Sequence, residues 1–365
     1  MKRININIII LVSIIFGIIW QGNAQVQNDE VYEFPALKQL KILGYRNIIN
    51  IPDLDSFITL KCDFHMHTIF SDGHVWPTMR AIEAWADGLD AIAITDHIES
   101  RHRRKKDFLL YNVNESCGIA RKKGDELGLL VINGAEITRK KPLGHINAIF
   151  LQDISKLDVE KELDAIDEAI EQGAYLILNH PGWPNDTSTL YPIHQELIAK
   201  KKLKGVEVFN GSEYYPKALD WCNNHGLTYF ANTDLHYASA NSYREKLQRP
   251  MTLVFAKERS IEGIKEALIA GRTLAYFNNH LAGKEEYLKE FIQKSLAVKV
   301  INAEKNTVEI LNHSDMYYEI RFGEYMYSIP LFANQALKIN IPPGTEILFT
   351  NCLISKDNCV KMKIW

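Results

Sequence analysis

Histidines and acidic residues occur in this sequence at spacings that suit metal binding. In His65-Met66-His67 the two imidazoles are separated by one residue, and Asp72 follows in a loop-like segment. Side chains two positions apart on a β-strand lie on the same face, so His65 and His67 can bind one ion together. A lone pair of this kind is equally typical of two hydrogen-bonded histidines, and the spacing alone leaves both interpretations open.

Five further polar clusters follow or begin short apolar runs. They are Thr95-Asp96-His97, Glu136, Gly144-His145-Ile146-Asn147, Asn179-His180-Pro181-Gly182 and Asp234-Leu235-His236. Burying an acid or a histidine beside a core costs several kcal/mol unless the group is paired or bound to a metal. With the first cluster they supply nine residues of the metal-ligand type: His65, His67, Asp72, His97, Glu136, His145, His180, Asp234 and His236. Such ligands suit Zn, Mn or Fe, so the sequence predicts a metal centre.

The other histidines are not placed in this way. We expect surface positions for His102, His194, His225, His280 and His313. His74 lies close to Asp72 and near the expected start of a helix, and its role stays open.

Between the clusters, strand patterns alternate with helical ones. Apolar runs predict strands over 89–94, 129–132, 146–151, 175–178, 206–209, 227–231 and 252–255. Pro77 suits a first helical turn, and Met79, Ile82 and Trp85 then recur at helical spacing. Continuous apolar strands alternating with helices favour a parallel sheet that is covered on both faces. We therefore predict an α/β fold, a distorted (βα)7 TIM-like barrel, with the polar clusters at the carboxyl ends of its strands.

Changes in pattern set the expected domain boundaries. Lys2 and Arg3, an apolar run at 8–19 and Gly22-Asn23-Ala24 predict a signal peptide over 1–24 and export to the periplasm or the extracellular space. An uncleaved N-terminal anchor is the alternative, although the run is short for a bilayer span. We assign 25–59 to a segment that wraps the barrel, 60–280 to the barrel, 281–297 to a connecting helix and 298–365 to a small all-β domain. No later segment suggests a membrane span.

The composition of the 365 residues is globular, with 46% hydrophobic and 24% charged residues, and excludes a disordered chain. The formal charge of −3 predicts no stable nucleic-acid partner. The five cysteines form no Cys-x-x-Cys pair. Cys352 and Cys359 flank a turn-like segment, where either a hairpin disulfide or two buried thiols would fit.

The motifs between residues 60 and 275 resemble those of the PHP (polymerase and histidinol phosphatase) family. They are HMHTIFSDG at 65–73, TDH at 95–97, GAE at 134–136, GH at 144–145, NHPG at 179–182 and TDLH at 233–236. The resemblance implies a distorted seven-stranded barrel with three divalent ions. It implies that one ion is held by His65, His67, Glu136 and Asp234, the second by Glu136, His145 and His180, and the third by Asp72, His97 and His236. The segments at 76–99 and 270–286 further resemble an exported phosphodiesterase subgroup.

We therefore predict an exported metal-dependent phosphoesterase and favour a phosphodiesterase over a phosphomonoesterase. In the predicted reaction, a metal-bridging hydroxide beside Glu136 and Asp234 attacks phosphorus. The predicted contacts of its small phosphoester substrate are Arg139, Lys141, Asn210 and Trp183, with the basic run at 101–106, Arg244 and Arg272 as weaker candidates. The alternatives are a phosphomonoesterase of the histidinol-phosphatase type, an amidohydrolase and a non-catalytic surface-binding protein on the same barrel. An amidohydrolase would usually use a bridging lysine where this sequence has Glu136.

Overall fold

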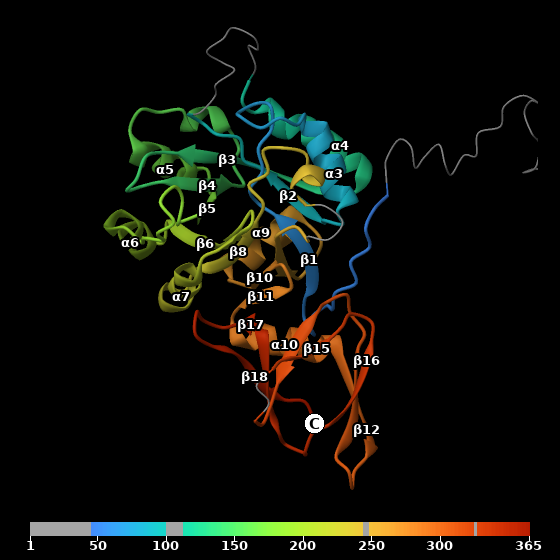
Figure 1. The fold of residues 1–365 in the computed structure, drawn as a ribbon. Coiled ribbons are helices and arrows are strands. Elements are labelled where there is room, and N and C mark those ends of the chain that lie inside the picture. The colour runs from blue at the N-terminus through green and yellow to red at the C-terminus, as the bar shows by residue number, and fades with distance from the viewer. Residues whose placement is uncertain (1–44, 100–111, 244–247, 325–326) are drawn as a thin grey trace, which may run out of the picture. The chain divides into compact units, whose positions relative to one another are not determined.

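The computed structural model describes residues 45–99, 112–243, 248–324 and 327–365. The predicted signal peptide, residues 25–44 of the predicted wrapping segment, the basic run at 101–106 and Arg244 lie outside these ranges. Residues from Arg46 to Trp365 form one compact unit (Figure 1). Within the described part of the chain, no helix is both long and apolar enough to cross a membrane.

A large mixed sheet forms the centre of the fold. Its central strands in hydrogen-bonding order are β9 (Met251–Ala256), β1 (Ile58–Asp63), β2 (Ala91–Ile94), β3 (Leu130–Thr138), β4 (His145–Ile149), β5 (Tyr175–Leu178), β6 (Leu203–Asn210) and β8 (Thr228–Asn232). Beyond β9 the sheet continues with β10 (Thr273–Phe277) and β11 (His280–Gly283), and the short β7 (Glu213–Tyr214) also pairs with β6. The neighbours β1–β2–β3 and β5–β6–β8 are parallel, whereas β4 and β9 run antiparallel to their neighbours. Each residue of β2 and β5 is buried, as the continuous apolar runs predicted.

The prediction of a closed barrel built only from parallel βα units needs correction. The six residues between β3 and β4 hold no crossover helix, so the chain folds back and the two strands pair antiparallel. Within the described residues, no backbone ladder joins β8 to β9 or to β10 (Thr273–Phe277). Side-chain hydroxyls connect these strands instead: Thr273 Oγ1 donates to Tyr229 O at 2.8 Å, and Thr252 Oγ1 accepts from Ala231 N at 3.0 Å.

Helices connect the strands along the chain. They are α3 (Pro77–Ala86), α4 (Glu115–Leu127), the 3₁₀ turn η3 (Ile154–Leu157), α5 (Glu162–Glu171), α6 (Pro192–Ala199), α7 (Pro216–His225), the short α8 (Ser239–Ser242) and α9 (Ile261–Ile269). Pro77, Pro192 and Pro216 stand at helix starts, where the missing N–H is not needed. The glycines that follow α4 and α7, Gly128 and Gly226, adopt left-handed backbone conformations that end these helices.

Helix α3 is rotated relative to its sequence pattern. Met79 is 51% exposed, and the buried residues are Pro77, Arg80, Ala81 and Ala84 rather than a stripe through Met79, Ile82 and Trp85. Two small alanines let the helix pack closely, and the arginine points inward because it finds carbonyl acceptors there.

The C-terminal strands form two sheets. The three-stranded antiparallel sheet consists of β12 (Leu296–Asn302), β13 (Thr307–Asn312) and β16 (Ala336–Asn340). The strands β14 (Tyr318–Arg321), β15 (Ile329–Leu331), β17 (Glu346–Leu353) and β18 (Cys359–Lys363) extend the main sheet, because β17 pairs in parallel with β11 (His280–Gly283). The connecting helix is α10 (Glu285–Ser295).

All five cysteines are free thiols. Cys359 lies opposite Leu353 in the β17–β18 ladder, and its Sγ faces the carbonyl oxygen of Thr350 at 3.2 Å. Cys352 is fully buried. The structure therefore has two free thiols and no hairpin disulfide, with Cys352 buried as one interpretation required and Cys359 half-buried.

Candidate metal centre

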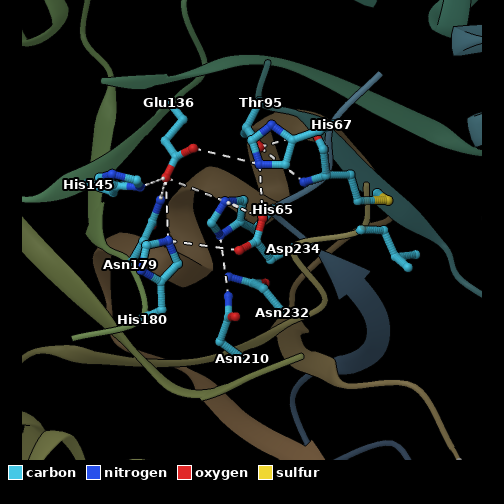
Figure 2. Close-up of polar contacts among 12 residues, drawn as sticks. His65, His67, Thr95, Glu136, His145, Asn179, His180, Asn210, Asn232 and Asp234 are labelled. Carbon is cyan, nitrogen blue, oxygen red and sulfur yellow. Dashed lines mark hydrogen bonds and ion pairs between the residues drawn. The ribbon is translucent and has the colours of Figure 1, made fainter. Parts of the chain in front are cut away.

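The nine predicted ligands meet at one edge of the sheet. His65 and His67 directly follow β1, His97 follows β2, His180 follows β5, and Asp234 and His236 follow β8. Glu136 lies within β3, which continues to Thr138 instead of ending before the glutamate, and His145 begins β4. Figure 2 shows His65, His67, Glu136, His145, His180 and Asp234 pointing toward a common centre. A cavity of about 550 Å³ opens above them, and seven of the nine ligands line it.

His65 and His67 converge on Asp234. The Nε2 atoms of the two histidines lie 3.2 Å and 2.9 Å from Oδ1 of Asp234. Both imidazoles are fully buried at the floor of the site. His65 and His67 lie beyond the end of β1, where Met66 between them forms an isolated parallel bridge with Leu235, and the spacing of two residues still brings both imidazoles to one carboxylate.

A second group surrounds Asp72. Its Oδ2 lies 3.3 Å from Nε2 of His97, and its Oδ1 lies 3.2 Å from Nε2 of His236. The Nδ1 atom of His67 approaches the same carboxylate at 3.9 Å. The ligand atoms of all four residues lie within 4.8 Å of one another, which suits a single ion.

Glu136 connects the two sides of the site. Its Oε1 lies 3.0 Å from Nδ1 of His145 and 3.5 Å from Nε2 of His180, whereas its Oε2 lies 2.6 Å from Nδ1 of His97. The third group that can hold an ion consists of His65, Glu136 and His180. A carboxylate whose two oxygens face different sets of imidazoles is arranged as a bridging ligand.

The residues pass a direct test of fit for metal ions. Within the described residues, no hydrogen-bond partner is found for several buried atoms: His65 Nε2, both ring nitrogens of His67, His145 Nδ1, Glu136 Oε2 and Asp234 Oδ1. Some of these atoms lie within 3 Å of one another without hydrogen-bond geometry, as Nε2 of His67 and Oδ1 of Asp234 do at 2.9 Å. Leaving a buried polar atom without a partner costs about 1–3 kcal/mol, and native proteins rarely tolerate it. A set of such atoms around one cavity fits divalent ions.

Two ligand residues have unusual backbone conformations. Asp234 and His180 have φ angles of 53° and 21°, in the region that favours glycine. Strain of this kind costs on the order of 1–3 kcal/mol and persists where neighbouring contacts hold it. Here the amide of Asp234 donates to His65 O at 2.9 Å, and the amide of His180 donates to Oε2 of Glu207 at 2.7 Å.

The charged groups of the site shift one another's pKa values, some upward and some downward. Burial opposes the charged form of His97, but Glu136 and Asp72 outweigh it and raise the pKa of His97 to about 10. Burial and then the charge of His97 lower the pKa of His67 to about 4. Burial would raise the pKa of Glu136, yet His97 and His65 hold it well below its usual range. Without metal, the site therefore keeps its carboxylates charged and binds protons on some imidazoles.

Glu207 on β6 is a functional residue that the sequence analysis missed. Its Oε1 lies 2.8 Å from Nδ1 of His65, and its Oε2 accepts from Asn210 Nδ2 at 2.8 Å. The carboxylate is fully buried and also accepts from Asn232 Nδ2 at 3.0 Å. Carboxylates that bind the far nitrogen of a metal-binding histidine fix its orientation and tautomer. An acid inside the apolar run Val206-Glu207-Val208 was the available signal.

Arg80 is a second missed residue. Its guanidinium is completely buried and donates to His67 O at 2.8 Å and 3.1 Å, to Leu235 O at 3.1 Å and to Tyr237 O at 2.9 Å. These carbonyls belong to the two loops that carry His65–His67 and Asp234–His236. Arg80 thus ties together two ligand loops that are far apart in the sequence.

The predicted substrate contacts divide into two groups. Asn210 and Trp183 line the metal cavity, although the Asn210 amide already donates to Glu207. Arg139 and Lys141 line an adjoining pocket instead. Two other predictions are wrong. Arg272, a weaker candidate for substrate contact, is buried against Phe255 O and Glu266. His194, predicted at the surface, is buried with its Nε2 2.7 Å from Leu143 O.

Comparison with known proteins agrees with this geometry. A solved structure of a two-domain protein from Bacteroides vulgatus, containing a predicted PHP-like metal-dependent phosphoesterase, is 39% identical, with a TM-score of 0.83. The match covers 87% of this chain and 98% of that one. This chain belongs to the PHP-like metal-dependent phosphoesterases.

Other solved structures resemble the PHP-like chain less closely. PsfC from Pseudomonas syringae is 20% identical over 60% of this chain and 92% of its own, with a TM-score of 0.41. The lesion-specific endonuclease EndoQ from Pyrococcus furiosus is 15% identical over 58% of this chain and 56% of its own, with a TM-score of 0.38. No protein-family model and no curated protein matches the sequence.

Proposed function

We propose that this PHP-like protein is a phosphodiesterase that uses three divalent ions. The observation that carries the proposal is the position of Glu136, whose two oxygens face different groups of imidazoles below one cavity. Asp72 on one side and Asp234 on the other complete ligand groups that each suit one ion. Three ligand groups around a shared carboxylate support three ions.

The ligand groups differ slightly from those that the family resemblance implies. His65 faces Glu136 as well as Asp234, and His67 faces Asp72 as well as Asp234. We propose that Asp234, His65 and His67 hold one ion, Glu136, His145 and His180 the second, and Asp72, His97 and His236 the third. Glu136 would be shared between the second and third groups, because its Oε1 faces His145 and His180 and its Oε2 faces His97. Zn, Mn and Fe suit this donor set.

The chain's own residues prepare the site for a phosphate ester. When bound, divalent ions supply positive charge that stabilises a phosphoryl group under attack and lowers the pKa of water. The carboxylates of Glu136 and Asp234 orient the imidazoles and keep their own charge near neutral pH. Asn179 Nδ2 donates to Glu136 Oε1 at 2.9 Å and fixes the bridging carboxylate. The aromatic ring of Trp183, with its centroid 5.0 Å from that of His145, forms part of the cavity wall.

The space around the ligands supports a diester over a monoester. The metal cavity of about 550 Å³ meets a second pocket of about 410 Å³, and the two share Thr138, His145 and Trp183 as walls. A phosphate held above the ligands can therefore extend one ester group into the adjoining pocket, while the rest of the metal cavity leaves room for a second ester group.

Hydrolysis of chromogenic esters tests the proposal. We expect the protein, loaded with Mn²⁺ or Zn²⁺, to hydrolyse bis-p-nitrophenyl phosphate faster than p-nitrophenyl phosphate. A preference for the monoester would favour the histidinol-phosphatase type of activity. Bound metal without turnover of either ester would favour the non-catalytic binding protein.

We also propose that the chain is exported, on the basic and apolar pattern of residues 1–24. Expression of the full chain in a bacterium followed by N-terminal sequencing tests this. A mature chain that begins at Gln25 supports export, and a chain that keeps Met1 in the cytoplasmic fraction contradicts it.

A further inference from the structure

The pocket beside the metal cavity differs from it in charge. The metal cavity is lined by the acids Asp72, Glu136, Glu213 and Asp234, and no lysine or arginine of the described residues lines it. The adjoining pocket is lined by Arg139, Lys140 and Lys141 and by no acid of the same described ranges. The two pockets share walls, so one ligand can occupy both.

The three basic residues of this pocket are not equivalent. Arg139 is engaged within the protein, because its Nε lies 2.7 Å from Oε1 of Glu99 and its terminal nitrogens donate to Val159 O and Glu160 O. Among the described residues, no carboxylate lies within ion-pair distance of the Nζ atom of Lys140 or Lys141. Arg139 therefore shapes the pocket, while the two lysine amines, which pair with no carboxylate in the described part of the chain, can bind an anion.

The remaining walls suit a carbon skeleton. Trp183 is 53% exposed and lines both pockets. Its ring lies beside those of His145 and His180 in the metal site, and Pro184 next to it lines the adjoining pocket. Aromatic rings in such positions bind flat or apolar groups. The walls thus pass from metal ligands through an aromatic side chain to two ammonium groups that have no carboxylate partner among the described residues.

We propose that this pocket binds the esterified group of the substrate and that this group carries a second anion, such as a phosphate or a carboxylate. The metal centre would hold the phosphate that is hydrolysed, Trp183 would contact the skeleton between the two anions, and Lys140 and Lys141 would bind the second anion. The assignment rests on the proposed phosphodiesterase function and adds the substrate class: esters with a distal negative charge.

Competition between two dinucleotides tests the assignment. Thymidylyl-thymidine (TpT) and its 5′-phosphorylated form (pTpT) differ by one terminal phosphate. Each dinucleotide is added to the metal-loaded protein during hydrolysis of bis-p-nitrophenyl phosphate, and its inhibition constant is measured. The constant can be measured whether the dinucleotide only competes for the site or is itself hydrolysed. We expect pTpT to bind about tenfold or more tightly than TpT, since charge-assisted contacts with two lysines are lost without the phosphate.

The double variant Lys140→Ala/Lys141→Ala identifies the pocket. We expect it to weaken pTpT inhibition about tenfold while the inhibition constant of TpT stays within about twofold. The variant Lys156→Ala/Lys200→Ala removes the same charge from exposed positions elsewhere and should retain the preference for pTpT. Where the proteins hydrolyse neither ester, calorimetric titration of TpT and pTpT into the metal-loaded proteins gives the same comparison.

The outcomes separate the two proposals. No hydrolysis of bis-p-nitrophenyl phosphate overturns the phosphodiesterase function, and calorimetry then still reports on the pocket. Equal binding of TpT and pTpT, or absence of binding by both, overturns the assignment of the pocket. So does a preference for pTpT that persists in the Lys140/Lys141 variant, or one that is lost in the Lys156/Lys200 control.

Discussion

The Nδ1 atom of His65 lies 2.8 Å from Oε1 of Glu207, and both side chains are fully buried. This contact directs the opposite nitrogen, Nε2, toward Asp234 at 3.2 Å and toward Glu136 at 3.7 Å. An imidazole held in this way presents a lone pair to the site, which is what a metal ligand needs.

We therefore predict that Glu207→Gln weakens metal binding about 10- to 100-fold, because a neutral amide orients the imidazole less firmly. Calorimetric titration of Mn²⁺ into the metal-free variant measures the change. Glu196→Gln, on the exposed face of α6, is the control and should bind like the wild type. Wild-type affinity in Glu207→Gln would show that the contact does not orient His65.

Replacing the bridging carboxylate should have the largest effect on activity. We predict that Glu136→Ala abolishes turnover and lowers the metal content of the purified protein, because ligands on both sides of the site lose a shared partner. Plasma mass spectrometry of protein purified without chelator, together with an assay on bis-p-nitrophenyl phosphate, measures both. Circular dichroism checks that the variant is folded. Retained activity with unchanged metal content would rule out the bridging role.

Arg80 should affect the site through the backbone. We predict that Arg80→Lys lowers the free energy of unfolding by roughly 1–3 kcal/mol, because an ammonium lacks the planar fork of donors with which the guanidinium reaches the carbonyls of His67, Leu235 and Tyr237. It should also weaken metal binding, since His67 and Leu235 lose their common donor. Urea unfolding and metal titration of the folded variant measure the two effects. If stability falls while metal affinity remains unchanged, Arg80 supports the fold without positioning the ligand loops.

The pKa of His97 predicts how the metal-free protein responds to pH. Its folded-state value of about 10 exceeds the unfolded value near 6.5, so its stabilising contribution is complete below about pH 6.5. That contribution is lost as the pH rises toward 10. Because metals bind the neutral imidazole, metal uptake at pH 7 should release protons, and affinity should rise with pH. Calorimetry in buffers of different ionisation enthalpy counts the protons, and uptake without proton release would contradict this prediction.

Thiol chemistry tests the C-terminal strands. Burial raises the pKa of Cys62, Cys222 and Cys352 well above the usual range and that of Cys117 to about 11. We predict that alkylation of the denatured protein, without reductant, modifies all five cysteines. In the folded protein only the half-buried Cys359 should react at an appreciable rate. A mass two units lower, with Cys352 and Cys359 unmodified, would reveal the disulfide that the structure lacks.

The sequence predicted the strands that carry the ligands better than the way in which those strands pair with one another. The apolar runs before His97 and His180 were predicted as strands because a strand that is buried on both faces is apolar throughout, and the structure confirms both strands. The reversal of β4 was not foreseen, since a run such as 145–149 reads the same in either direction. Arg80 and Glu207 were missed because their roles depend on partners far away in the sequence, a carbonyl at Leu235 and an imidazole at His65. Spacing along one element cannot reveal such partners.

The central claim is that residues from six strands hold three divalent ions in one site. Anomalous diffraction from crystals grown with Mn²⁺ tests it most directly. We predict three anomalous peaks beneath the cavity, with Glu136 in contact with two of them and one peak within ligand distance of Asp72, His97 and His236. A map without peaks at these residues, from protein that binds and retains Mn²⁺, would contradict the account.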